Sequence, residues 1–238
     1  MTRCMVSNGL PRLVKAGMRE AKQTPWRRLV KLTSIIVVAG LMGVSLWVGL
    51  APYVGSLVAS PFLIFGVLVT FGGLYAVGQL TMRVYVRDDT VPLFDSEIRR
   101  LAAAWTMYSF LFVVGAAFFI VPGVYVLARL APYIPRVVHG DDVFAGVTAT
   151  WEGNTPYVKP VMGQGLVYVG TGLFLAACLA GLPVLLVLGI RGVMGSVITG
   201  VTGYVFGSVA LVLLSVVVNS YMVGVAREIG SFSGPRAR

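Results

Sequence analysis

Long tracts without a charged side chain dominate this sequence. The longest covers residues 32–82, and others cover residues 101–128, 160–190 and 192–226. A helix of about 20 apolar residues spans the hydrocarbon core of a bilayer. Average water-soluble domains carry charges on about a quarter of their residues, whereas only 12% of the residues here are charged and 57% are hydrophobic. The sequence therefore predicts an all-α fold, namely a polytopic membrane helical bundle.

Proline, glycine and one arginine divide these tracts into six predicted transmembrane helices. Breakers between Pro52 and Pro61 separate the first two spans, Pro122-Gly123 forms a tight turn between spans three and four, and Arg191 separates spans five and six. Span four is short and contains two prolines, so we expect it to be kinked. The six spans form three hairpins, and an interfacial amphipathic helix with a tryptophan precedes each hairpin.

The positions of the basic residues predict the orientation. Eight of the 19 Lys and Arg residues lie in the first 31 residues, and the turns on the opposite side of the six-span layout hold only Arg191. This bias places both termini in the cytoplasm of a multi-pass plasma-membrane protein. We therefore divide the chain into a basic amphipathic leader (1–31), a six-span membrane domain (32–228) and a short cytoplasmic tail (229–238). A basic edge beside a bilayer indicates anionic lipid as its partner, and nucleic acid is not expected.

The leader contains one strongly amphipathic segment at residues 8–23. Its apolar residues recur at helical spacing, and four cations lie on the opposite side, namely Arg12, Lys15, Arg19 and Lys22. We expect this helix to lie in the interface plane with its cations toward lipid headgroups. A solvated basic tail is the alternative interpretation.

Four polar side chains within the predicted spans are candidates for an intramembrane site. Arg129 is the sharpest, because a charge in the middle of a bilayer costs roughly 2.5 kcal/mol or more. It either provides a counter-charge for an anionic headgroup or solute, or bonds backbone carbonyls freed by Pro132 and Pro135. The uncharged candidates are Gln79, Ser215 and Asn219, which either join helices or line a route.

The sequence supplies little chemistry for catalysis. Its only histidine, His139, lies near Asp141 and Asp142, which is a weak acid-base or metal set, and we expect one of the two acids to cap the short helix that follows. The two cysteines lie in opposite environments, so no disulfide is expected, and we predict neither a metal nor a cofactor. The predicted function is non-enzymatic: a membrane-organising, lipid-interacting or accessory and assembly subunit, with a membrane-protein partner or a second copy of the chain. The alternative is a small transporter or channel for an anionic solute or lipid.

One segment resembles a known group. Residues 120–157 contain Pro122, Gly123, Tyr125 and Arg129, followed by an acidic turn and Gly153-Asn154. This order resembles the YciC-like inner-membrane proteins and the membrane domain attached to some glycerophosphodiester phosphodiesterases, a group of prokaryotic six-span proteins. The sequence departs from the group in its amphipathic segment, which is usually richer in arginine. The resemblance implies a six-span fold and a membrane location, and it does not imply catalysis, because the phosphodiesterase activity belongs to a separate soluble barrel.

Overall fold

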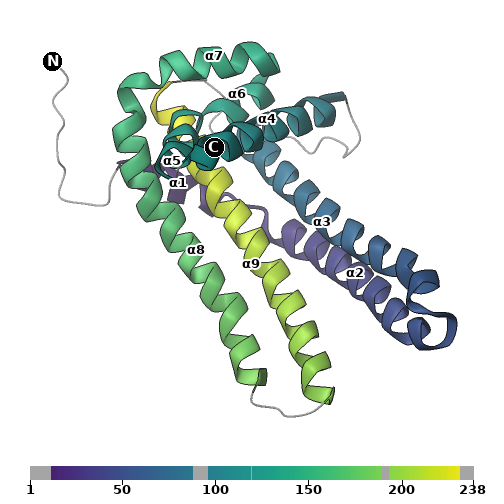
Figure 1. The fold of residues 1–238 in the computed structure, drawn as a ribbon. Coiled ribbons are helices and arrows are strands. Elements are labelled where there is room, and N and C mark those ends of the chain that lie inside the picture. Colours follow the sequence, from purple (N-terminus) through teal and green to yellow (C-terminus); the bar gives the residue numbers. More distant parts are fainter. Residues whose placement is uncertain (1–11, 88–95, 119, 189–192, 231–238) are drawn as a thin grey trace. The chain divides into compact units, whose positions relative to one another are not determined.

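The computed structural model of the chain describes residues 12–87, 96–118, 120–188 and 193–230, and within these ranges it is helical with no strand (Figure 1). The elements follow in chain order: α1 (Arg12–Lys22), α2 (Trp26–Val54), α3 (Ser56–Arg87), α4 (Ser96–Phe118), α5 (Ile120–Arg129), α6 (Tyr133–His139), α7 (Val143–Gly153), the short 3-10 helix η1 (Thr155–Tyr157), α8 (Val158–Leu188) and α9 (Val193–Glu228). The all-α class predicted from the sequence is confirmed for these residues.

Four of the described helices, α2, α3, α8 and α9, are long and apolar enough to cross a membrane. Many of their large apolar side chains are exposed, and Leu57 and Tyr53 each expose 86% of their surface. Because monomeric soluble proteins rarely expose large contiguous apolar patches, these helices indicate a membrane protein. The chain separates into two compact units, which we describe one at a time.

Unit 2 comprises residues 25–80 and 172–216 and contains most of the length of these four helices. The α2 and α3 helices meet at Gly55, whose φ of +87° is costly for any residue with a Cβ. The two helices cross closely where Gly43 faces Gly66, since a Cβ added to Gly43 would lie 2.7 Å from the Gly66 Cα. A small apolar core joins α2, α3 and α9 through Leu29, Val77, Val212 and Val216.

Unit 1 comprises residues 1–24, 81–171 and 217–238, of which the first eleven, 88–95, 119 and the last eight are outside the described ranges. Its main core gathers side chains from the end of α3, from α4, from α6 and from the last turns of α9. Leu130, Tyr133 and Ile134 are completely buried there. Consequently the segment that follows α5 is the centre of a packed protein core.

The expected turn at Pro122-Gly123 is absent, because both residues lie inside the first turns of α5. Proline is tolerated there since the first N–H groups of a helix have no intrahelical partner. Gly123 instead allows close packing, because a Cβ on Gly115 of α4 would lie 3.1 Å from the Gly123 Cα. The junction of α4 and α5 falls at residue 119, outside the described ranges.

The predicted fourth span is also not one continuous helix. The α5 helix ends at Arg129, residues 130–132 form a turn, and α6 restarts at Tyr133 and ends at His139. With ten residues, α5 rises only about 15 Å. We expected Pro132 and Pro135 to kink one helix. The structure instead shows two separate helices, with a break that includes Pro132.

The expected acidic cap is confirmed at the start of α7. Asp142 accepts hydrogen bonds from the backbone N–H groups of Phe144 (2.9 Å) and Ala145 (3.2 Å). The neighbouring carboxylate of Asp141 instead pairs with Arg136 at 2.8 Å. Both acidic residues of this turn, Asp141 and Asp142, therefore have a local structural role.

Candidate functional site

The candidate site is the cluster around Arg129, the last residue of α5. Its Nε donates to the backbone carbonyl of Trp151 at 3.0 Å, one terminal nitrogen donates to the Tyr125 hydroxyl at 2.6 Å, and the other donates to the Thr155 hydroxyl at 2.7 Å. Tyr125 lies one turn before Arg129, and the other two partners come from α7 and η1. The guanidinium therefore ties the end of α5 to the end of α7.

Two aromatic rings flank the same guanidinium. Its central carbon lies 4.1 Å from the centre of the Trp151 ring and 5.8 Å from that of Tyr125. The two rings meet edge to face at 6.3 Å. Since the face of an aromatic ring attracts a cation, these rings fix the direction of the side chain as well as its position.

Asn154 also ties the end of α5 to the segment after α7, through backbone carbonyls of α5. Its amide nitrogen donates to the carbonyls of Ala128 (3.0 Å) and Arg129 (2.8 Å), two of the last acceptors of α5. Helix ends leave such carbonyls unpaired unless another group reaches them. Asn154 is almost fully buried, so its side chain acts as a structural cap for α5.

The charge of Arg129 has no carboxylate partner among the described residues. The ion pairs in that part of the chain belong to other arginines, and the three acceptors of Arg129 are neutral. A guanidinium has five N–H groups, so one on each terminal nitrogen remains after these bonds. The site is a partly exposed, fixed cation that keeps donors for one more acceptor.

The other predicted polar residues are not partners of Arg129. Asn219 is buried near the end of α9 in unit 1, whereas Ser215 belongs to unit 2 and lies against Gly78 of α3, where an added Cβ would be 2.8 Å from its Oγ. Gln79 lies in α3, but its side chain is outside the described part of the structure. Ser215 therefore joins α9 to α3, and neither Ser215 nor Asn219 is among the hydrogen-bond partners of Arg129.

The leader helix α1 differs from the expectation in one respect. Its apolar face, including Leu13 and Val14, is buried against the protein. Gly17 lies against the backbone of α9, because a Cβ added to Gly224 would be 2.7 Å from the Gly17 nitrogen. This face is therefore not available for insertion into lipid.

The predicted lipid-facing cations of α1 divide into two pairs. Arg12 and Arg19 bind Glu228 at 2.6 and 3.3 Å, whereas Lys15 and Lys22 are exposed. Lys15 and Lys22 have no ion pair among the described residues, so they remain the cations best placed for a headgroup.

Sequence reasoning missed the polar contact that secures α1. Glu20 is 1% exposed and accepts from one terminal nitrogen of Arg227 at 3.0 and 2.9 Å. Burial raises the pKa of Glu20 above its ordinary 4.5, although Arg227 and Arg19 act against this shift. The available signal was that Glu20 is the only acid in the basic leader.

Comparisons with protein families, with curated proteins and with solved structures find no match for this chain. The resemblance to the YciC-like group therefore remains a hypothesis that depends on the motif from Pro122 to Asn154. In this structure the motif residues Tyr125, Arg129 and Asn154 do form one connected cluster.

Proposed function

We propose that this chain is a non-enzymatic multi-pass protein of the plasma membrane that binds anionic lipid headgroups on its cytoplasmic side. Its role would then lie in membrane organisation, or in the assembly of a partner as an accessory subunit. The observation that carries the proposal is the Arg129 cluster. A fixed cation with neutral partners and spare donors, held between a tyrosine and a tryptophan, has the chemistry that recognises a lipid phosphate at the interface.

The number of crossings is part of the proposal. Six crossings remain the prediction of the sequence and of the YciC-like resemblance, but the ten residues of α5 reach only about half of a hydrocarbon core of roughly 30 Å. We therefore favour four crossings, by α2, α3, α8 and α9. The α4–α5 pair then enters from the cytoplasmic side and returns to it. Both layouts have an even number of crossings and keep both termini in the cytoplasm.

Native mass spectrometry with defined lipids tests the proposed binding. The full-length chain is mixed with phosphatidylglycerol or with phosphatidylcholine of the same acyl chains, and the retained lipids are counted. We expect more phosphatidylglycerol than phosphatidylcholine on the wild-type chain, and a weaker preference in Arg129→Gln. Equal retention of the two lipids by the wild-type chain would contradict the proposal.

A matched variant separates headgroup binding from a purely structural role of Arg129. Arg99→Gln removes the same charge at an exposed position of α4 that has no ion pair among the described residues. If Arg129 only holds the fold, Arg129→Gln lowers the yield of protein while the remaining folded chains keep their lipid preference. If it binds lipid, Arg129→Gln lowers the preference of folded chains and Arg99→Gln does not.

A further inference from the structure

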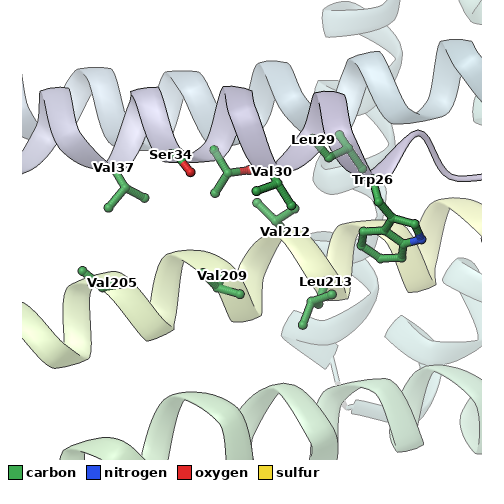
Figure 2. Close-up of a pocket in the computed structure, with 10 residues that line it drawn as sticks. Trp26, Leu29, Val30, Ser34, Val37, Val205, Val209, Val212 and Leu213 are labelled. Carbon is green, nitrogen blue, oxygen red and sulfur yellow. The ribbon is translucent and has the colours of Figure 1, made fainter.

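A groove lies between α2 and α9 in unit 2. Its volume is about 180 Å³, and its lining is apolar except for Thr33 and Ser34. Figure 2 shows valines of α9, such as Val205 and Val209, facing the side chains of α2 across it. The groove is partly open, and its helices are long and apolar enough to cross a membrane, so it faces hydrocarbon rather than water. Hydrocarbon is therefore the fitting content.

The groove has a direction and a length. Trp26 lies at one end with its indole toward α9, and Val37 and Val205 lie at the other end (Figure 2). The eleven steps from Trp26 to Val37 rise about 16 Å along α2, which is close to half of a hydrocarbon core of roughly 30 Å. This is the depth that one acyl chain of a single leaflet occupies.

The Trp26 end of the groove is positively charged. Arg27, Arg28 and Lys31 are exposed on the first turns of α2, and none of them has an ion pair among the described residues. Within α2, Trp26 to Val54, there is no acidic residue to compensate them. Arg27 directly follows a lining residue, and Lys31 lies one turn further along the same side of the helix. An anionic group at this end would meet two cations beside the groove.

A buried hydroxyl provides a third, independent observation. Thr33 lines the groove and is 7% exposed, and its Oγ1 has no hydrogen-bond partner in the described part of the chain. An unsatisfied buried hydroxyl is costly, so such groups normally have a partner. Thr33 lies about 10 Å from Trp26 along the helix. An ester carbonyl of a lipid bound in the groove would accept a hydrogen bond from its hydroxyl at this depth.

We propose that this groove binds one anionic glycerophospholipid, with an acyl chain between α2 and α9, an ester carbonyl at Thr33 and the phosphate at Arg27 and Lys31. The inference depends on the proposed function, because it assigns a specific site to a lipid-binding membrane protein. It is independent of the Arg129 cluster, since none of its residues belongs to that cluster.

Three variants with matched controls test the site in the full-length chain, with phosphatidylglycerol and phosphatidylcholine as probes in native mass spectrometry. Val209→Trp fills the groove, and Leu211→Trp places the same side chain at an exposed position of α9 that does not line it. We expect Val209→Trp to weaken phosphatidylglycerol retention about tenfold, which corresponds to displacing roughly two methylene groups. Leu211→Trp is expected to bind as the wild type does.

The cations at the Trp26 end and the Thr33 hydroxyl are tested in the same assay. Arg27→Gln with Lys31→Gln should lower the preference for phosphatidylglycerol, whereas Arg99→Gln with Lys159→Gln removes two exposed positive charges that do not border the groove and should leave the preference intact. Thr33→Val should weaken retention about fivefold, the value of one hydrogen bond of roughly 1 kcal/mol.

The outcomes distinguish the groove from the general proposal. Equal retention by Val209→Trp and Leu211→Trp, or an equal loss in the two double variants, would overturn the groove while lipid binding by the chain stands. A wild-type chain that shows no preference for phosphatidylglycerol would overturn both.

Discussion

Replacing Arg129 with alanine is the most informative single perturbation of the candidate site. The change removes three hydrogen bonds, to the Trp151 carbonyl, the Tyr125 hydroxyl and the Thr155 hydroxyl, together with a cation–π contact on Trp151. It leaves the backbone carbonyls at the end of α5 paired, because Asn154 still donates to them. The loss is therefore confined to the connection that the guanidinium makes between α5 and the end of α7.

The expected magnitude follows from the exposure of the partners. The Trp151 carbonyl keeps the Thr155 hydroxyl as a donor at 3.1 Å, and the exposed hydroxyls of Tyr125 and Thr155 can bond to water instead, so no buried group is left unsatisfied. Each lost bond then counts at the low end, about 0.5 kcal/mol, and the exposed cation–π contact adds roughly 0.5 to 1 kcal/mol. We expect a destabilisation of about 2 kcal/mol, or a melting temperature lowered by roughly 4 to 8 °C.

Thermal unfolding of the purified chain in detergent measures this effect. Arg129→Lys should fall between the wild type and Arg129→Ala, because lysine keeps the charge but cannot reach three acceptors with one ammonium group. Arg99→Ala is the control for the loss of one exposed charge. A melting temperature of Arg129→Ala that equals that of Arg99→Ala would refute the reasoning, because the hydrogen bonds would then contribute nothing.

Three further predictions concern local contacts. Gly224→Ala places a Cβ 2.7 Å from the Gly17 nitrogen, so α1 should detach and its amides should exchange hydrogen faster; unchanged protection would contradict the close crossing. Gly43→Val should destabilise the α2–α3 pair by about 1 to 3 kcal/mol through overpacking against Gly66, measured as a lower unfolding temperature. Backbone N–H groups of α7 hold the pKa of Asp142 below its ordinary 3.8. The stabilising contribution of its carboxylate is therefore present above pH 3.8 and is lost as the pH falls through the lowered pKa. Asp142→Asn should remove this pH dependence of the unfolding temperature.

The sequence predicted local features well where a short range of residues decides them. Uncharged tracts of this length predict apolar helices because a helix pairs all of its backbone groups within one segment, and the four long helices agree with this. The cap at Asp142 needs only an acid at the start of an apolar helical pattern. Arg129 was identified because a charge in an apolar tract is rare. Its partners were not predicted correctly, because its Nε donates to the carbonyl of Trp151 and not to a carbonyl freed by Pro132 or Pro135.

The failures come from contacts that are distant along the chain. The apolar side of α1 has the same pattern whether it faces lipid or protein, and only the crossing with Gly224 decides for protein. The ion pair of Glu20 and Arg227 joins residues separated by 207 positions, which no local pattern reveals. Pro122-Gly123 was predicted as a turn because the pair is a typical breaker, but proline is also common at the start of a helix and glycine at a close helix crossing.

The central claim is that the chain crosses a membrane an even number of times and that α4–α5 does not reach the far side. Single cysteines in a background of Cys4→Ser and Cys178→Ser, labelled in intact cells with a membrane-impermeant maleimide, test it most directly. We expect Ser56→Cys, at the α2–α3 turn, to react from outside and His139→Cys to react only after the cells are opened. Ala117→Cys, near the tip of α4–α5 within the hydrocarbon core, should react from neither side, because a maleimide needs a thiolate that water reaches. Labelling of His139→Cys from outside would contradict the account as a whole. Labelling of Ala117→Cys alone from outside would restore the six-crossing layout.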